Sequence, residues 1–166
     1  MHKSVDEQEF VKKVTESQGI VHKVCGMYCN DEEDRKDLFQ EILIQLWKSY
    51  PNFRGDAKFS SWMYRVALNV AISNLRKSKT KKEDSTLPES FDSISRESDE
   101  QSLSLEKGLL REAIRKLNEI EKAIMVLYLE EKPNDEIAEI MGITQNNVRV
   151  KMNRIRNKLK ETLNPN

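Results

Sequence analysis

Residues 133–160 read PNDEIAEIMGITQNNVRVKMNRIRNKLK, a pattern that predicts two short helices joined by a tight turn. In the first helix Asn134 is placed as the N-cap, acidic residues fill the opening turn, and Gly142 ends the helix. Thr144 is placed to cap the second helix. The apolar residues of that second helix recur at helical spacing and form one inward stripe, which consists of Val148, Met152, Ile155 and Leu159.

The outward face of the second helix carries amides, one small apolar residue and cations. Its members are Asn146, Asn147, Val150, Asn153, Arg154 and Asn157, flanked by Arg149, Lys151, Arg156, Lys158 and Lys160. Amides and cations are the side chains that read base edges and neutralise phosphates in a major groove. The spacing is that of a helix-turn-helix, although a solvated basic helix packed against its neighbour has a similar composition.

The composition of the 166-residue chain favours helices, arranged as one domain or two small ones. Charged residues make up 34% and hydrophobic residues 37%, with only five glycines and four prolines. The net charge is zero, which argues against a protein that coats nucleic acid with its whole surface. The charge is instead local, since every charge from Arg149 to Lys160 is positive whereas the segment from Glu119 to Glu139 is mostly acidic.

Several classes of protein and site are not expected. No apolar run approaches the length of about 18 residues that a membrane span needs, and no signal peptide is apparent, so a cytoplasmic protein is predicted. The sequence contains no Gly-rich phosphate loop and no pair of catalytic carboxylates, so no catalytic residue, cofactor or small-molecule substrate is expected. His22, Cys25 and Cys29 could form part of a metal or redox site, but no fourth ligand is near and core cysteines are the simpler interpretation.

The N-terminal part of the chain predicts two helical segments. Residues 5–29 form the first, in which Gly19 is a point where the helix can bend. The acidic run from Asn30 to Asp34 is expected to cap the second, which runs from Arg35 to Tyr50. This helix is expected to bury Leu38, Phe39, Ile42, Leu43, Leu46 and Trp47. The opposite face carries Asp37, Gln40, Glu41, Ile44, Gln45 and Lys48. There Ile44 is either a harmless exposed residue or the apolar centre of a partner-binding surface.

Residues 51–59 are predicted to form a loop with two rings and two cations around Gly55. These are Phe53, Arg54, Lys58 and Phe59. Rings can stack on an unpaired base while cations hold its phosphates, but both phenylalanines could equally plug the local core.

A third helix, from Ser60 or Ser61 to about Lys79, follows. One face of it carries Arg65, Asn69, Ser73 and Arg76, extended by Lys77, Lys79, Lys81 and Lys82. Such a stripe fits a nucleic-acid surface, and also a solvated face.

Composition also divides the chain into domains. From 83 to 104 it is rich in Ser, Asp and Glu and poor in apolar residues, which predicts a flexible acidic linker. Residues 105–118 and 119–131 then predict two amphipathic helices. Their apolar residues are expected to supply the core for the final helix pair: Leu109, Leu110, Ile114, Leu117, Ile120, Ile124, Met125, Leu127, Tyr128 and Leu129. The expected fold is all-α, with a three-helix domain over 1–82, the linker over 83–104 and a four-helix domain over 105–166.

The order of these motifs resembles the bacterial sigma factors of the extracytoplasmic-function (ECF) group. The runs that resemble sigma region two are Asp37–Glu41 with Leu46-Trp47, then Phe53-Arg54-Gly55, then Trp62–Ala67 with Asn69. Residues 105–160 resemble region four, and the linker lies where the family has it. The resemblance covers nearly the whole chain and implies a non-enzymatic subunit that directs core RNA polymerase to promoters and helps to open the DNA.

The resemblance also implies a role for individual residues. Docking on the clamp helices of the large polymerase subunit is implied for Asp37, Gln40, Glu41, Ile44 and Gln45. Capture of a base flipped from the downstream promoter element is implied for the loop from Phe53 to Phe59 with Asn69. Contact with the nearby DNA is implied for Arg54, Lys58, Arg65, Ser73, Arg76 and Lys77. Reading of the upstream element in the major groove is implied for Thr144, Gln145, Asn146, Asn147, Arg149, Val150, Lys151 and Arg154.

Core RNA polymerase and promoter DNA are thus the expected partners, together with an anti-sigma factor, since relatives are often held inactive by one. Ser73 departs from the family pattern, because many relatives carry an acidic residue there. Two other functions stay open at this level: a stand-alone helix-turn-helix regulator and a helical protein-binding adaptor. The regulator would bind a promoter tightly without polymerase, and the adaptor would show no dependence on promoter sequence.

Overall fold

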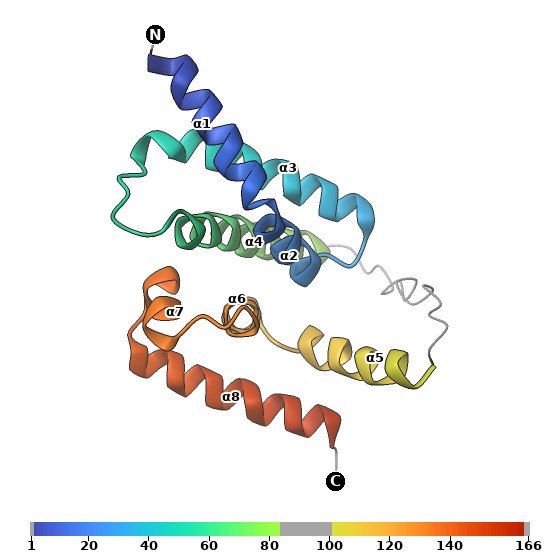
Figure 1. Ribbon diagram of the computed structural model, residues 1–166. Coiled ribbons are helices and arrows are strands. Elements are labelled where there is room, and N and C mark those ends of the chain that lie inside the picture. The colour runs from blue at the N-terminus through green and yellow to red at the C-terminus, as the bar shows by residue number, and fades with distance from the viewer. Residues whose placement is uncertain (1, 84–100, 165–166) are drawn as a thin grey trace. The chain divides into compact units, whose positions relative to one another are not determined.

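Helices account for all regular structure in the described residues, 2–83 and 101–164, of the computed structural model (Figure 1). The chain divides into two units, Met1–Lys81 and Lys82–Asn166, each with its own core. The predicted all-α class with two helical domains is therefore confirmed. Within the described residues, no helix combines the length and the apolarity needed to cross a membrane.

The first unit is built on the third and fourth of its α-helices. Its elements are α1 (His2–Glu16), α2 (Gln18–Tyr28), α3 (Glu32–Ser49), the 3-10 turn η1 (Tyr50–Asn52) and α4 (Phe59–Glu83). The core draws on all four α-helices, with Phe10 and Val14 from α1, and its most buried side chains include Val21, Val24, Leu38, Ile42, Leu46, Met63, Tyr64, Ala67 and Leu68. Small residues recur on α4, so this helix can approach its neighbours closely.

The first predicted helical segment is in fact two helices, and the break between them lies at Ser17 rather than at Gly19. Ser17 has φ −111° and ψ 18°, which is not helical, and its carbonyl accepts a hydrogen bond from the backbone N–H of Ile20 at 3.0 Å. Gly19 lies inside α2, and a Cβ at this position would meet no heavy atom within 4 Å. Neither the backbone nor the available space therefore requires glycine at position 19.

The predicted acidic cap of α3 is confirmed, and it starts the helix earlier than expected. The carboxylate of Asp31 accepts a hydrogen bond from the backbone N–H of Glu33 at 2.9 Å, so α3 begins at Glu32 and not at Arg35. The predicted burial of Trp47 is wrong, since this side chain is 45% exposed. Its ring packs at the edge of the core against Phe10, with ring centroids 5.1 Å apart.

The helices on both sides of the predicted linker are longer than their sequence indicates. α4 begins at Phe59, where the backbone N–H of Trp62 donates to the carbonyl of Lys58 at 3.0 Å, and continues to Glu83. α5 begins at Gln101, so residues 101–104 are helical and not linker. The remainder of the predicted linker, 84–100, lies outside the described residues.

The second unit packs three helices around a long C-terminal one. Its elements are α5 (Gln101–Arg115), α6 (Glu119–Leu129), α7 (Asn134–Met141) and α8 (Gln145–Leu163), and α8 contacts each of the other three. The buried side chains include Ala113, Leu117, Ala123, Ile124, Leu127, Ile137, Ile140, Val148, Met152 and Ile155. The predicted inward stripe of α8 is confirmed at its three buried positions, and its fourth member, Leu159, is half-buried.

Two expectations for this unit are wrong. Asn134 is the first residue of α7 and not its N-cap, because Pro133 occupies the cap position and its carbonyl accepts from the backbone N–H of Ile137 at 3.0 Å. Four residues predicted to lie in the core are exposed by 41–53%: Leu109, Leu110, Tyr128 and Leu129. Ala113 near the C-terminal end of α5 is buried, and the predicted core residue Leu117, two residues after the end of this helix, is buried as well.

Candidate nucleic-acid interface

The turn between α7 and α8 fixes the start of α8. Gly142 has φ 69°, a left-handed conformation in which glycine has no Cβ penalty, and it ends α7 as predicted. The hydroxyl of Thr144 then accepts a hydrogen bond from the backbone N–H of Asn147 at 3.1 Å. The predicted cap is thus confirmed, and it defines which side chains of the first turn point outward.

The outward face of α8, here called the α8 face, consists of the residues predicted to read duplex DNA. Of these, Thr144, Gln145, Asn146, Asn147, Arg149, Val150 and Arg154 are exposed, and Lys151 is half-buried. Val150 is 40% exposed, so its methyl groups are accessible among the polar side chains of this face. In the described part of the chain Arg149 and Arg154 form no ion pair, so both guanidinium groups remain available.

Two side-chain contacts join α8 to α6, outside the α8 face. Lys158 donates from Nζ to Oε1 of Glu121 at 2.7 Å, and the Glu121 side chain is only 6% exposed. Arg156 lies over the ring of Tyr128, 6.0 Å from its centroid. These cations therefore stabilise packing and do not belong to the α8 face. The spacing of Glu121 from Asn118, that of a capping box, is the one signal in the sequence that marks this carboxylate.

The loop between η1 and α4 carries a cluster of aromatic rings. The rings of Phe53 and Phe59 meet nearly perpendicularly, with centroids 5.7 Å apart, and both lie within 5.4 Å of the Trp62 centroid. The ring of Tyr50 stacks on Phe53 at 6.4 Å. Because both phenylalanines are only half-buried, one part of each ring packs on the protein and another part remains accessible. The two interpretations offered by the sequence, local core plug and stacking surface, are therefore compatible.

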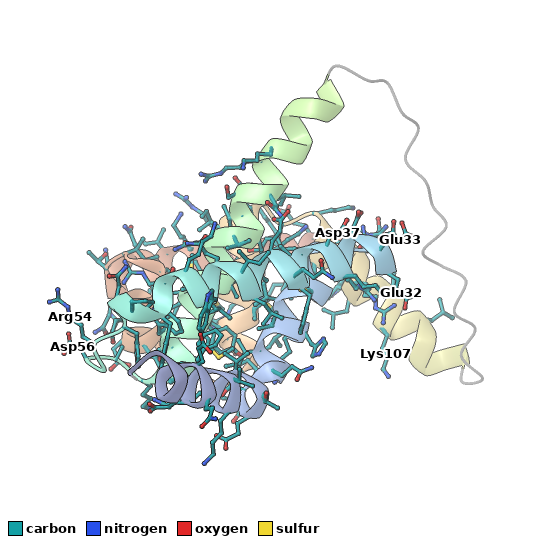
Figure 2. The ribbon with its side chains drawn as sticks, turned by 90° about the horizontal axis from the view of Figure 1, so that it is seen from above. Glu32, Glu33, Asp37, Arg54, Asp56 and Lys107 are labelled. Carbon is teal, nitrogen blue, oxygen red and sulfur yellow. The ribbon has the colours of Figure 1, made fainter. Side chains whose placement is uncertain are left out.

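The tip of the same loop is polar and turns sharply. Gly55 has φ 80°, which allows the chain to reverse without strain. Figure 2 shows Arg54 and Asp56 projecting outward from this tip. Lys58, also exposed, precedes α4. The loop thus presents cations around accessible ring surface, as a site for unpaired nucleic acid would require.

The members of the predicted stripe on α4 up to Lys77 are exposed, whereas the side chains of Lys79, Lys81 and Lys82 lie outside the described part of the chain. Arg65, Asn69, Ser73, Arg76 and Lys77 all face solvent. Asn69, Ser73 and Lys77 also line a shallow groove of about 470 Å³ between α3 and α4. The rise per residue of a helix puts Asn69 about 15 Å along α4 from Phe59, so the groove and the ring cluster are separate parts of the surface.

The opposite wall of this groove comes from α3. Glu41, Ile44 and Gln45 line it, and Ile44 is 53% exposed among polar neighbours. The Asn74 side-chain amide of α4 donates a hydrogen bond to the Glu41 carboxylate, which links the two helices across the groove. Asp37 and Gln40, the remaining members of the predicted polymerase-binding set, are exposed earlier on α3, and Figure 2 shows Asp37 and Glu33 on one side of this helix. The sequence alone predicts two separate surfaces, one on α3 and one on α4. In the fold these two surfaces face each other across one groove.

The cysteine pair lies inside the first unit. Burial, reinforced by the neighbouring Cys29 thiol, raises the pKa of Cys25 to about 11. Burial and the carboxylate of Asp34 raise the pKa of Cys29 to about 11 as well. The ring of His22 stacks on Phe39, with centroids 4.7 Å apart, and among the described side chains no three potential ligands gather to hold a metal ion.

Known proteins share both halves of this arrangement. The family model for Sigma-70 region 2 matches residues 14–81, and the model for Sigma-70, region 4 matches residues 107–159. The chain is 24% identical to the ECF RNA polymerase sigma factor SigW of Bacillus subtilis, over 97% of this chain and 92% of that protein. It is 37% identical over 57 residues to the RNA polymerase sigma-H factor of Pseudomonas aeruginosa, a match that spans 32% of this chain and 30% of that protein.

A solved structure has the same fold. The sigma factor RpoE of Bartonella quintana, crystallised with the anti-sigma factor NepR, superposes with a TM-score of 0.75 at 19% identity and covers 94% of this chain and 97% of its own. Fold, the two matched regions and full-length relatives agree with the resemblance noted in the sequence. The chain belongs to the sigma-70 family and is an RNA polymerase sigma factor of the ECF group.

Proposed function

We propose that this sigma factor divides promoter recognition between its two units. The α8 face reads the duplex of the upstream element, whereas the ring cluster and the α4 stripe hold unpaired DNA of the downstream element. The observation that carries this proposal is the α8 face itself, on which amides, Val150 and two arginines are exposed opposite the buried residues Val148, Met152 and Ile155.

Duplex reading by α8 follows from side-chain chemistry. Amides form paired hydrogen bonds with adenine in the major groove, so the first-turn residues Gln145, Asn146 and Asn147 suit adenine-containing sequence. Val150 offers an apolar contact for a thymine methyl group. Arg149, Lys151 and Arg154 bind phosphates, and an arginine can also pair with guanine.

Strand opening is assigned to the first unit. Extruding a base from a duplex costs a few kcal/mol, and stacking of one base on an aromatic side chain returns about 1–3 kcal/mol. The accessible ring surfaces of Phe53 and Phe59 supply this stacking, and Asn69 in the groove supplies polar contacts to the unpaired strand. Arg54, Lys58, Arg65, Arg76 and Lys77 would hold the phosphates, and Ser73, a neutral residue, leaves the groove without an added carboxylate.

The exposed α3 residues Asp37, Gln40, Glu41, Ile44 and Gln45 would dock this unit on core polymerase. Ile44→Glu should then weaken binding to core polymerase by about tenfold or more, because the substitution buries a charge in the contact. Val11→Glu is a matched control, since Val11 is 60% exposed on α1, outside this surface. Equal losses from both substitutions would contradict docking through Ile44.

The partners of the chain follow from this division. Core polymerase performs the chemistry in the cytoplasm, and this chain supplies recognition without catalysis. Because the net charge of the chain is zero, polymerase is expected to provide much of the affinity for DNA. The fold-related RpoE was crystallised with an anti-sigma factor. We extend that mode of control to this chain and expect an anti-sigma partner to hold it inactive.

Run-off transcription over a promoter library tests the proposal. Core polymerase alone and core polymerase with the full chain are compared, and unpaired thymines are detected with permanganate. The expected result is sequence-specific transcription and strand opening only when both components are present. Tight promoter binding without polymerase would favour a stand-alone regulator, and binding to polymerase without strand opening would contradict the role of the first unit.

A further inference from the structure

A lysine of α1 lies over the rings of the loop proposed to bind unpaired DNA. Nζ of Lys13 is 5.5 Å from the centroid of the Phe59 ring and 6.0 Å from that of Phe53. Both distances lie within the range of a cation–π interaction. A cation that the loop itself does not supply is thus placed at the same pair of rings.

Packing of α1 fixes the position of this lysine. Phe10 and Val14, on either side of it in the sequence, are 7% and 8% exposed. The Phe10 ring contacts Trp47 of α3 and Tyr50 of η1, with centroids 5.1 and 5.0 Å apart. Since Tyr50 in turn stacks on Phe53, a continuous set of ring contacts joins α1 to the loop. The Lys13 backbone is therefore held in place relative to the rings before any DNA binds.

The present partner of the ammonium group is one that a phosphate can replace. Oε1 of Glu9 lies 3.2 Å from Nζ of Lys13, and the two side chains are 50% and 36% exposed. Ion pairs this exposed contribute little to stability, because water screens them. A DNA phosphate offers the ammonium a charge-assisted hydrogen bond of at least equal strength.

We propose that Lys13 binds a backbone phosphate of the unpaired strand, next to a base stacked on Phe53 or Phe59. This inference rests on the proposed function of the loop, and it adds α1 to the site for single-stranded DNA. The Sigma-70 region 2 match begins at residue 14, so Lys13 lies outside the matched segment. Glu9 competes with the phosphate for the same ammonium group.

The test compares substitutions that change the charge of α1 equally. Lys13→Met removes the ammonium but keeps the apolar stem, and Lys12→Met does the same at an exposed neighbour that points away by about 100° around the helix. Holoenzyme made with each full-length variant is titrated against two templates of one sequence, a duplex promoter and a promoter with a pre-melted downstream element. Fluorescence anisotropy is recorded over a series of salt concentrations.

We expect Lys13→Met to lower affinity for the pre-melted template by about three- to tenfold and to reduce the salt slope by about 0.7, the value for one phosphate contact on a single strand. Lys12→Met should change neither quantity. Glu9→Gln should increase affinity for the pre-melted template, because it removes the competing carboxylate. Equal effects of Lys13→Met and Lys12→Met, or weaker binding by Glu9→Gln, would overturn the assignment.

The wild-type titration separates this inference from the function on which it rests. If wild-type holoenzyme binds both templates equally, the proposed role of the loop fails. If it prefers the pre-melted template and the Lys13 and Glu9 variants behave like wild type, only the role of Lys13 fails. Glu9→Gln keeps the inference testable even if Lys13→Met disturbs the fold.

Discussion

Nζ of Lys158, on α8, lies 2.7 Å from Oε1 of Glu121, the same oxygen that accepts a hydrogen bond from the backbone N–H of Asn118 at 2.9 Å. The Asn118 side chain accepts in return from the backbone N–H of Glu121 at 2.8 Å, which completes a capping box at the start of α6. A single carboxylate thus stabilises the N-terminus of α6 and fixes α8 against it. This contact adds to the packing against α5, α6 and α7 that orients the α8 face.

Glu121→Ala should destabilise the second unit by about 2 kcal/mol, because it removes a helix cap and one partner of a charged hydrogen bond. Lys158→Met should cost less, about 0.5–1 kcal/mol, since the lysine side chain is 45% exposed. Amide hydrogen exchange measures both effects as lost protection in α6 and α8, with α2–α4 unchanged. Lys160→Met, at an exposed position of α8, is the control. Equal losses from Lys158→Met and Lys160→Met would show that the ion pair contributes nothing specific.

Glycine is required at one turn of the second unit and not within its first helix. Gly142→Ala should destabilise this unit by about 1–2 kcal/mol, because φ is 69° and an L side chain is strained there. Gly108→Ala, inside α5, should stabilise it by about 0.5–1 kcal/mol, since alanine favours a helix over glycine. A Cβ at either position would meet no heavy atom within 4 Å, so backbone conformation alone distinguishes the two substitutions. Thermal unfolding followed by circular dichroism measures both, and the same sign for both would contradict this explanation.

The two cysteines should be poor nucleophiles at neutral pH. Burial raises the pKa of Cys25 from 9.0 to about 11, so at pH 8 its thiolate fraction, and its alkylation rate by iodoacetamide, should be roughly 100-fold lower than for a free cysteine. In the unfolded chain the thiol keeps its ordinary pKa of 9.0, so it ionises at a lower pH than in the folded chain. The stability contributed by the folded thiol is therefore fully present below pH 9 and is lost as the pH rises through 11.

Alkylation is followed by mass spectrometry of the intact chain, and stability by urea unfolding of the first unit between pH 8 and 11. A Cys25→Ala, Cys29→Ala double variant gives the baseline for all other effects of pH. The wild-type chain should lose more stability than the double variant over this pH range. Rapid alkylation at pH 8 would instead indicate that the thiols are open to solvent and available for redox chemistry.

The elements that the sequence predicted best are those set by local interactions. Gly142, Thr144 and the stripe beginning at Val148 define the turn and α8 without reference to the remaining chain, and the Asp31 cap is equally local. The sequence predicts Asn134 as the N-cap of α7, but the neighbouring Pro133 occupies this position through its carbonyl alone. Local rules identify the residues that favour a helix end. Neighbouring positions differ only by a small free energy as the site of that end, so the exact cap residue is hard to predict.

Tertiary packing decided what the sequence could not. Apolar spacing on α5 marked Leu109 as core, yet the fold leaves it 50% exposed. The ion pair between Glu121 and Lys158 joins residues 37 positions apart, and the position of Lys13 over Phe53 and Phe59 depends on how α1 packs. The family resemblance supplied roles for α3 and α4 separately, but only the fold showed that their residues line one groove.

The division of labour between the two units predicts different defects for two asparagines. Asn147→Ala on α8 should lose about 1–3 kcal/mol of discrimination at one position of the upstream element, the value of a paired contact with a base, and leave strand opening intact. Asn69→Ala in the groove should reduce permanganate reactivity of the downstream element more than initial binding by holoenzyme. Asn164→Ala, at the exposed C-terminal cap of α8 and outside the α8 face, is the control. Holoenzyme with each variant is assayed on a promoter library by run-off transcription, anisotropy and permanganate. If Asn69→Ala and Asn147→Ala both shifted only the overall affinity, the upstream and downstream roles assigned to the two units would be wrong.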